Sequence, residues 1–270
     1  MSASPLVTVL LPVWNGASLP LTAEGEEPLR VAIRSLARQE AAPDAPVPGF
    51  EVLAVDDGST DGTAALLDAL AAEYPCLRVL HRPHEGLPGA LNAGLESARG
   101  ALIARMDADD VCHPQRLALQ AAWMAEHPET GLLATRVHFG GDRETARGFA
   151  HFVDWQNGLL DHEAISRNRF RDTPVSHPSV MFRRELPRLH GGYADGFFAE
   201  DWELWLRWLH AGVRMAKLPQ ELLVWNDPPR RATRSDSRYC EAANNQLRAL
   251  WLARWLERHN PWHPRVYLLG

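Results

Sequence analysis

Short apolar runs alternate with helical patterns through the first half of the chain, and this alternation constrains the fold more than any other feature. Runs rich in Val, Ile and Leu predict buried strands, and apolar residues at helical spacing between them predict helices. The predicted strands are Leu6–Pro12, Glu51–Val55, Leu77–His81 and Ala101–Met106, and the predicted helices are Leu29–Gln39, Thr63–Glu73, Leu87–Ala98 and Pro114–His127. This order predicts an α/β fold with a central, mostly parallel sheet flanked by helices, which binds its ligand at the carboxyl ends of the strands.

The regular alternation stops after a further apolar run. In the second half we expect a less regular set of elements, closed by a long amphipathic helix. The predicted elements are a strand at Leu132–Phe139, one helix near Trp155–Ser166, a strand at Ser179–Phe182, a helix at Asp201–Ala211, short strands at Val213–Leu218 and Leu222–Trp225, and the long helix over about Tyr239–His259. Trp202, Trp205 and Trp208 recur at every third residue, which is typical of a helix face buried in a core.

Charge and cysteine content exclude several classes of protein. The chain has 28 Lys and Arg against 34 Asp and Glu, a formal net charge of −6, so it lacks the basic surface that nucleic-acid binding requires. Its three cysteines form no CxxC pair, which argues against a disulfide framework or a thiolate zinc site and predicts a reducing, cytoplasmic location. No stretch approaches the roughly 20 apolar residues of a membrane span, although a peripheral contact with a membrane stays compatible with the sequence.

Two adjacent carboxylates, Asp56 and Asp57, directly follow the second predicted strand and precede a glycine turn. Carboxylates at the end of a strand can accept hydrogen bonds from a nucleobase or a ribose. A turn with a helix cap would account for Ser59, Thr60 and Asp61, but it leaves the doubled aspartate unexplained.

A second acidic group follows the fourth predicted strand, where Asp107, Asp109 and Asp110 lie within four residues. Such crowded carboxylates repel one another unless a cation lies between them, and oxygen ligands suit Mg²⁺ or Mn²⁺. If the backbone stays extended, Asp107 and Asp109 point to the same side and could hold a metal that neutralises a diphosphate leaving group. A solvated acidic loop is the simpler alternative.

A third acidic pair, Glu200 and Asp201, opens a predicted helix. Carboxylates in a first helical turn commonly do no more than complement the helix dipole. Here Phe197, Phe198 and Trp202 flank the pair, and partial desolvation by these rings would prepare a carboxylate to act as a general base.

Taken together, the motifs occur in a specific order. They are VTVLLPVWN, VDDGSTDGT, GLPGALNAGLESARG, MDADD, HPSVMFRRE, GGY and EDWELWLR. In this order and spacing the chain closely resembles the family 2 glycosyltransferases with a GT-A fold, over roughly Val7–Leu218. The resemblance implies an inverting transferase that moves a sugar from a nucleotide-diphosphate sugar, by default a UDP-sugar, to a hydroxyl on a glycan or lipid-linked sugar acceptor. It also implies a divalent metal, Mn²⁺ or Mg²⁺, and a role in cell-surface glycan biosynthesis.

The resemblance assigns roles by position. Asp201 matches the catalytic base, with Glu200 beside it, and Asp107 and Asp109 match the metal motif, with Asp109 as the direct ligand. The nucleotide-binding positions are Pro12, Trp14, Asn15, Asp56, Asp57, Arg82, Asn92 and Asp107. His177 falls on the acceptor side of the site, where it either contacts the acceptor or phosphate or serves as a structural hydrogen-bonding residue. Arg231 and Arg234 lie where an arginine-bearing loop of the family can close over the donor diphosphate; a solvated loop before the last helix is the alternative. No QxxRW signature occurs, which argues against a processive polysaccharide synthase.

Two other functions fit parts of the pattern. A non-catalytic nucleotide-sugar binding module would keep the fold and the acidic motifs. A sugar nucleotidyltransferase shares the sheet and metal site, but the stretch after Val13 lacks the glycine-rich, lysine-bearing loop expected there. We expect a catalytic domain over residues 1–225 and an arginine-rich loop with a helical extension over 226–270. The strand-like ending at 264–270 suggests a chain shortened before a further segment.

Overall fold

A mixed sheet of eight strands forms the centre of the computed structural model, which describes residues 4–227, 236–262 and 264–265. The strand order is β3-β2-β1-β4-β7-β6-β8-β5. The strands are β1 (Val7–Val13), β2 (Phe50–Asp57), β3 (Leu77–Arg82), β4 (Leu102–Arg105), β5 (Val111–Cys112), β6 (Thr130–Phe139), β7 (Met181–Arg183) and β8 (Arg214–Trp225).

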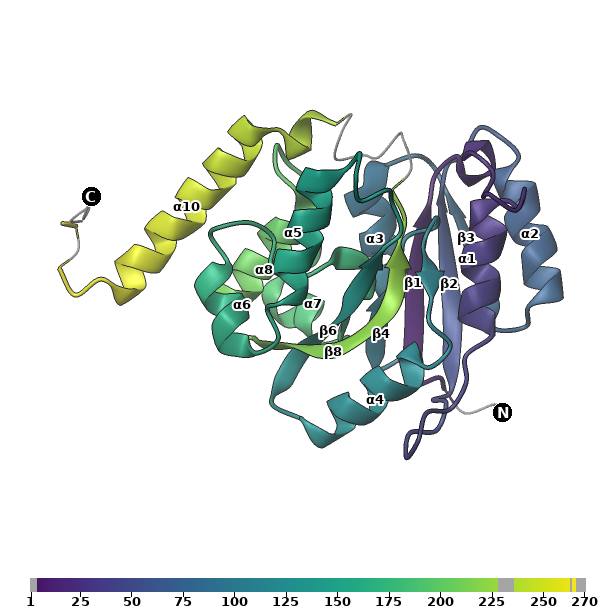
Figure 1. Cartoon of the computed structure of the whole chain (residues 1–270), viewed down its shortest axis with the longest axis horizontal. Helices are drawn as coiled ribbons and strands as arrows, with labels where there is room; N and C mark the ends of the chain where they lie inside the picture. Colours follow the sequence, from purple (N-terminus) through teal and green to yellow (C-terminus); the bar gives the residue numbers. More distant parts are fainter. Residues whose placement is uncertain (1–3, 228–235, 263, 266–270) are drawn as a thin grey trace.

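Helices cover both faces of this sheet (Figure 1). They are α1 (Pro28–Ala37), α2 (Thr63–Glu73), α3 (Gly86–Ser97), α4 (Arg116–Glu126), α5 (Arg147–Asn157), α6 (His162–Asn168), α7 (Leu186–His190), α8 (Glu200–His210) and α10 (Glu241–His259). Three short 3₁₀ helices are η1 (Gly16–Ser18), η2 (His177–Ser179) and η3 (Ser237–Tyr239).

The four strands β3, β2, β1 and β4 are all parallel, as the alternating sequence predicts. Every residue of β1 is buried, because helices lie on both faces of the sheet. Val9 and Leu11 belong to a core cluster that includes residues of α1, α2, α4 and α5, whereas Leu10 belongs to one that includes residues of α3 and α8. The carboxyl ends of β1, β2 and β4 therefore meet at one edge of the sheet, and the predicted acidic motifs lie there.

The other half of the sheet brings distant segments of the chain together. β7 is antiparallel to both β4 and β6, and β8 runs parallel to β6. The short β5, just after the acidic group that follows β4, pairs with the end of β8, with Val111 opposite Val224. This pairing fixes the acidic turn against the stretch that follows β8.

Two predictions for the second half are wrong. The single helix expected near Trp155–Ser166 is two helices, α5 and α6, because the chain breaks at Gly158 and Asp161 caps the new helix by accepting a hydrogen bond from the Ala164 amide. The two strands expected between residues 213 and 225 form one strand, β8, whose irregular register with β6 lets it continue through the polar residues 219–221.

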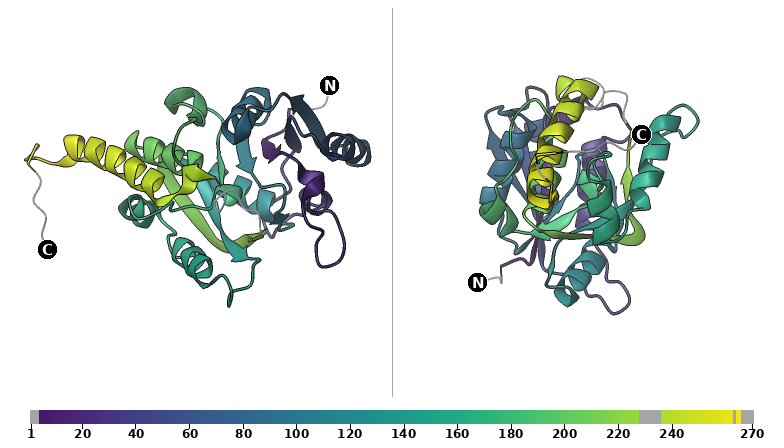
Figure 2. Two further views of the ribbon diagram at one scale, coloured as in Figure 1. Left: turned by 90° about the horizontal axis from the view of Figure 1, so that it is seen from above. Right: turned by 90° about the vertical axis from the view of Figure 1, so that its left-hand side faces the viewer.

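Helix α10 lies along the outside of α8, and its C-terminal end projects beyond the rest of the structure (Figure 2). Leu247 and Trp251 on α10 pack against Trp202 and Leu206 on α8. The expected boundary between residues 225 and 226 stays a prediction, and the strand-like ending lies mostly outside the described residues. Of the helices in the described part of the chain, none is long and apolar enough to span a bilayer.

Candidate active site

A cavity of about 440 Å³ opens at the carboxyl ends of β1, β2 and β4. Four of the residues predicted to bind a nucleotide line it, together with a segment from just before α10. The lining residues are Pro12, Val13, Trp14, Asp57, His84, Gly86, Leu87, Ala90, Asp107, Asp236, Arg238 and Tyr239. We call this space the donor cavity.

One wall of the donor cavity is aromatic. The side chain of Trp14 is 56% exposed and stacks on the ring of His84, with 4.8 Å between ring centroids and 22° between ring planes. Exposed, stacked rings of this kind offer a flat face to a nucleobase. Sequence reasoning missed His84, because a single histidine in the loop after β3 carries no pattern of its own.

Asp57 is buried and holds the loop that carries His84. Its Oδ1 accepts a hydrogen bond from the Glu85 amide at 2.8 Å, and its Oδ2 accepts one from the Gly86 amide at 2.9 Å. His84 Nδ1 lies 2.8 Å from Oδ2 as well. The chain passes so closely here that a Cβ at Gly58, where φ is +65°, would lie 2.5 Å from the His84 nitrogen. Among the described residues Oδ1 accepts this one hydrogen bond, and a carboxylate oxygen can accept two.

The other predicted nucleotide-binding residues lie outside the donor cavity and have partners within the protein. Asp56 accepts a hydrogen bond from the Ser59 amide and pairs with His81, and Asn15 accepts one from the Thr60 amide. Arg82 is paired with Glu85. Asn92 bonds to the backbone of Tyr193 through both atoms of its amide group, at 2.8 and 2.9 Å.

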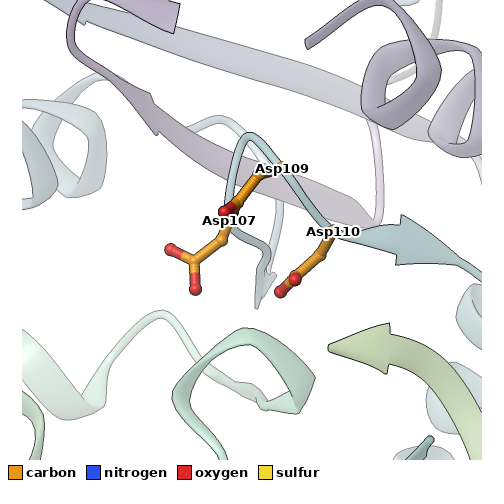
Figure 3. A group of neighbouring side chains, drawn as sticks. All are labelled: Asp107, Asp109 and Asp110. Carbon is orange, nitrogen blue, oxygen red and sulfur yellow. The ribbon is translucent and has the colours of Figure 1, made fainter. Parts of the chain in front are cut away.

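The turn after β4 brings three carboxylates together (Figure 3). One oxygen from each of Asp107, Asp109 and Asp110 lies within 4.8 Å of the others. Asp107 faces the donor cavity, whereas Asp109 faces a second cavity of about 720 Å³ beneath the loop that precedes α1. The acidic turn thus forms a wall shared by the two cavities.

Asp110 is the buried member of this group, and one of its carboxylate oxygens could bind a cation. Its Oδ1 accepts a hydrogen bond from the Asn226 amide at 2.9 Å, while its Oδ2 has no hydrogen-bond partner in the described part of the chain. Burial, reinforced by the charges of Asp107 and Asp109, raises the pKa of Asp110 well above its ordinary value. A buried oxygen without a partner and an all-oxygen donor set fit a hard divalent ion such as Mg²⁺ or Mn²⁺.

Arg105, the last residue of β4, is the buried cation of the site and was missed by sequence reasoning. Its side chain is 3% exposed, and its Nη2 lies 2.5 Å from Asp107 Oδ1. Its Nε and Nη1 have no hydrogen-bond partner among the described residues. Although burial opposes it, the charges of Asp107 and Glu200 raise the pKa of Arg105, so the guanidinium stays charged. An arginine inside an apolar strand was the available signal.

The acidic pair occupies the first turn of α8, as predicted. Glu200 is buried and accepts a hydrogen bond from the Tyr239 hydroxyl at 2.6 Å. Asp201 keeps part of its surface exposed and accepts a hydrogen bond from the Trp202 amide at 2.7 Å. Loss of solvation, followed by the charge of Glu200, raises the pKa of Asp201 to about 7. This is the range in which a carboxylate can take up a proton near neutral pH.

His177 is buried behind the acidic pair. Its Nε2 lies 2.8 Å from the Tyr193 hydroxyl and its Nδ1 lies 3.9 Å from Glu200 Oε1. Burial and the nearby charge of Arg105 lower the pKa of His177 well below its ordinary value, so the ring is neutral. It does not line the donor cavity. Arg231 and Arg234, the other predicted diphosphate or acceptor contacts, lie outside the described residues.

Trp202, Trp205 and Trp208 are all buried, as predicted for a core face of α8. Trp205 and Trp208 pack edge to face with ring centroids 5.6 Å apart. They fix α8, and hence the acidic pair at its start, against the sheet.

Several known proteins similar to this chain are named as glycosyltransferases. A 29% identical relative is the amylovoran biosynthesis glycosyltransferase AmsE of Erwinia amylovora, matched over 81% of this chain and 75% of that protein. Another, 27% identical over 72% of this chain and 67% of that protein, is the Escherichia coli UDP-Gal:alpha-D-GlcNAc-diphosphoundecaprenol beta-1,3-galactosyltransferase.

Solved structures share the fold. S. aureus TarS in complex with UDP-GlcNAc superposes with a TM-score of 0.66 at 19% identity, covering 97% of this chain and 76% of that one. The mannosyltransferase PcManGT of Pyrobaculum calidifontis, in complex with GDP-Man and Mn²⁺, gives a TM-score of 0.62 at 22% identity, covering 85% of this chain and 59% of that one. The fold is that of the GT-A transferases, as predicted.

The model of the family described as glycosyl transferase family 2 matches residues 8–187, which include all of β1 except Val7, the acidic turn and β7. The chain is an enzyme of glycosyl transferase family 2.

Proposed function

We propose that this enzyme transfers a sugar, with inversion, from a nucleoside-diphosphate sugar to a hydroxyl of a cell-surface glycan or of its lipid-linked precursor. The observation that carries the proposal is that Tyr239, which lines the donor cavity together with Asp107 of the acidic cluster, donates a hydrogen bond to Glu200 of the acidic pair at 2.6 Å. We therefore treat the groups for donor binding and for proton removal as parts of one site.

The donor cavity has the features that a nucleotide requires. A base could stack on the face of Trp14 that is turned away from His84. Asp57, whose Oδ1 could accept a further hydrogen bond, lines the same cavity. Asp107 also lines this cavity and would face the ribose or diphosphate of the donor. The default donor is a UDP-sugar, and the named complexes with UDP-GlcNAc and GDP-Man support a nucleotide sugar of this general kind.

The acidic cluster would hold the metal. Asp107 and Asp109 are the proposed ligands, with the unpartnered oxygen of Asp110 next to them. A bound Mn²⁺ or Mg²⁺ supplies positive charge that stabilises the departing nucleoside diphosphate.

Asp201 is the proposed general base. A direct displacement at the anomeric carbon needs a group that accepts the proton of the acceptor hydroxyl, and Asp201 is a partly exposed carboxylate whose pKa lies at about 7. Glu200, buried beside it, raises that pKa through its negative charge.

The acceptor class rests on the relatives. One is named for amylovoran biosynthesis and another for transfer to a diphosphoundecaprenol-linked sugar. The described cysteines are all free, in keeping with the cytoplasmic location that we propose.

A thermal-shift screen tests the proposal. UDP, GDP, UDP-Gal, UDP-GlcNAc, UDP-Glc and GDP-Man would each be added with Mn²⁺, with Mg²⁺ and with EDTA. We expect at least one nucleoside diphosphate and its sugar to raise the Tm in the presence of metal, because ligands of the native state stabilise it. Binding without any release of nucleoside diphosphate would instead favour a non-catalytic binding module.

A further inference from the structure

The hydroxyl of Tyr239 links the donor cavity to the acidic pair. The residue ends η3, just before α10, and it contributes to the wall of the cavity that also contains Trp14 and Asp107. Its hydroxyl donates a hydrogen bond to Glu200 Oε2 at 2.6 Å. One side chain therefore touches both the space proposed for the nucleotide sugar and the residue next to the proposed base.

The packing around Tyr239 fixes its position. Asp236 accepts hydrogen bonds from the Arg238 amide at 2.9 Å and from the Arg238 guanidinium at 2.9 and 2.6 Å, which closes the short turn. Tyr239 packs with the cluster in which Leu247 of α10 meets Trp202 of α8. The turn before α10 therefore holds the Tyr239 ring next to the first turn of α8.

Glu200 depends on this contact because it is buried. Its side chain is 4% exposed, and its other carboxylate oxygen faces His177 at 3.9 Å, which is beyond hydrogen-bond distance. Without the Tyr239 hydroxyl, the described residues would leave this carboxylate with no hydrogen-bond donor from a side chain. A buried charge that loses its hydrogen bond is costly, so the first turn of α8 would have to shift.

We propose that Tyr239 is a positioning residue for sugar transfer: by holding Glu200 it places Asp201 relative to a nucleotide sugar bound in the donor cavity. This inference rests on the proposed function. The inference assigns a role in the active site to the segment before α10. This segment lies outside residues 8–187, which the family model matches. The consequence is that the placement of the base depends on a residue of the cavity wall.

The variant Tyr239→Phe tests the inference, because it removes only the hydroxyl. We expect kcat for release of nucleoside diphosphate from the best donor of the screen to fall about tenfold, which matches the usual loss of a hydrogen bond to a charged group. The KM for that donor should stay within about twofold, since the ring remains in the cavity wall. The matched control is Tyr74→Phe, which removes a hydroxyl paired with Glu73 at the end of α2 and should leave kcat and KM unchanged.

A second measurement separates this role from ring packing. In a Glu200→Ala background the hydroxyl has lost its partner, so adding Tyr239→Phe should lower the Tm by far less than it does in the otherwise unchanged chain. A Tyr239→Phe variant with the original kcat, or an equal loss of Tm in both backgrounds, would overturn the inference. A parent chain that transfers no sugar would contradict the proposed function and this inference together, whereas full turnover by Tyr239→Phe contradicts the inference alone.

Discussion

The guanidinium of Arg105 lies 2.5 Å from the carboxylate of Asp107, at the point where β4 ends and the acidic turn begins. Both groups belong to the same stretch of chain, and the arginine is almost entirely buried while the aspartate is 32% exposed to the donor cavity. The pair therefore places a permanent positive charge beneath a cluster of carboxylates that would otherwise repel one another.

Removing this charge should destabilise the fold. Arg105→Met keeps a long apolar side chain but removes the positive charge that acts on Asp107 and on the buried carboxylate of Glu200. Because a buried charge is then left uncompensated, we expect a loss of about 3 kcal/mol in the free energy of unfolding. The control is Arg143→Met, which breaks the exposed ion pair with Asp154 and should cost no more than about 1 kcal/mol. Urea unfolding measures both. Equal, small losses in the two variants would show that the buried pair contributes little.

The Asp201→Asn variant should separate catalysis from binding. The amide keeps the size of the side chain but cannot accept a proton, so we expect turnover to fall about 10²- to 10⁴-fold. The Kd for UDP, measured by calorimetry with Mn²⁺ present, should change by less than about threefold, because Asp201 does not line the donor cavity. Turnover that survives this substitution would rule out Asp201 as the base.

The activity should depend on pH through Asp201. Since its pKa is raised to about 7, the carboxylate becomes available as pH rises, and kcat should increase between about pH 6 and pH 8. The contribution of Asp201 to the free energy of unfolding should instead decrease as pH rises. Between the ordinary pKa of 3.8 and about 7, the folded chain binds a proton that the unfolded chain does not, so this contribution is present at low pH and is lost as pH rises through 7. Asp201→Asn should remove this part of the pH dependence of the Tm.

The metal site is tested by Asp109→Asn, which removes one charge from the acidic cluster. We expect the rise in Tm caused by Mn²⁺ with UDP to shrink markedly, because a metal ligand of the native state has been weakened. Asp44→Asn is a suitable control: it is exposed, lies far from the cluster in sequence, and has a φ of 60°, which asparagine adopts readily. A full Mn²⁺ response in Asp109→Asn would exclude this residue as a ligand.

The aromatic wall predicts a nucleotide affinity. Trp14→Ala should weaken UDP binding about tenfold or more, since stacking of a base on an aromatic ring contributes roughly 1–3 kcal/mol. Fold stability should change little, because the Trp14 side chain is 56% exposed. Trp262→Ala removes another exposed tryptophan, 68% exposed near the C-terminal end of the described chain, and should leave UDP binding unchanged. Calorimetric titration of both variants provides the comparison.

The first half of the fold could be predicted because its strands and helices follow simple local rules. In β1 every residue is buried, and Thr63–Glu73 forms α2 over the predicted range. The break at Gly158 had local signals, the glycine itself and the capping residue Asp161, and these were missed. The continuous β8 could not be predicted, since pairing with a distant strand decides whether residues 219–221 continue a strand.

The site was predictable to the extent that it consists of carboxylates at strand ends and at a helix start. Asp107, Asp109 and the Glu200–Asp201 pair follow this rule. Arg105 had a local signal, a cation inside an apolar strand, that was missed. His84 and Tyr239 had none, because their contacts are with distant residues: Asp57 for His84 and Glu200 for Tyr239. Contacts of this kind depend on the folded structure and have no local signature.

The central claim, inverting transfer at this site, is tested most directly by the configuration of the first sugar product. Proton NMR can follow the anomeric signal while the enzyme consumes an α-linked UDP-sugar with Mn²⁺, using water or a simple sugar as the acceptor and Asp201→Asn as the inactive reference. The account predicts that the β-anomer accumulates first, before any mutarotation, because a single displacement inverts the anomeric carbon. Initial release of the α-anomer would contradict it.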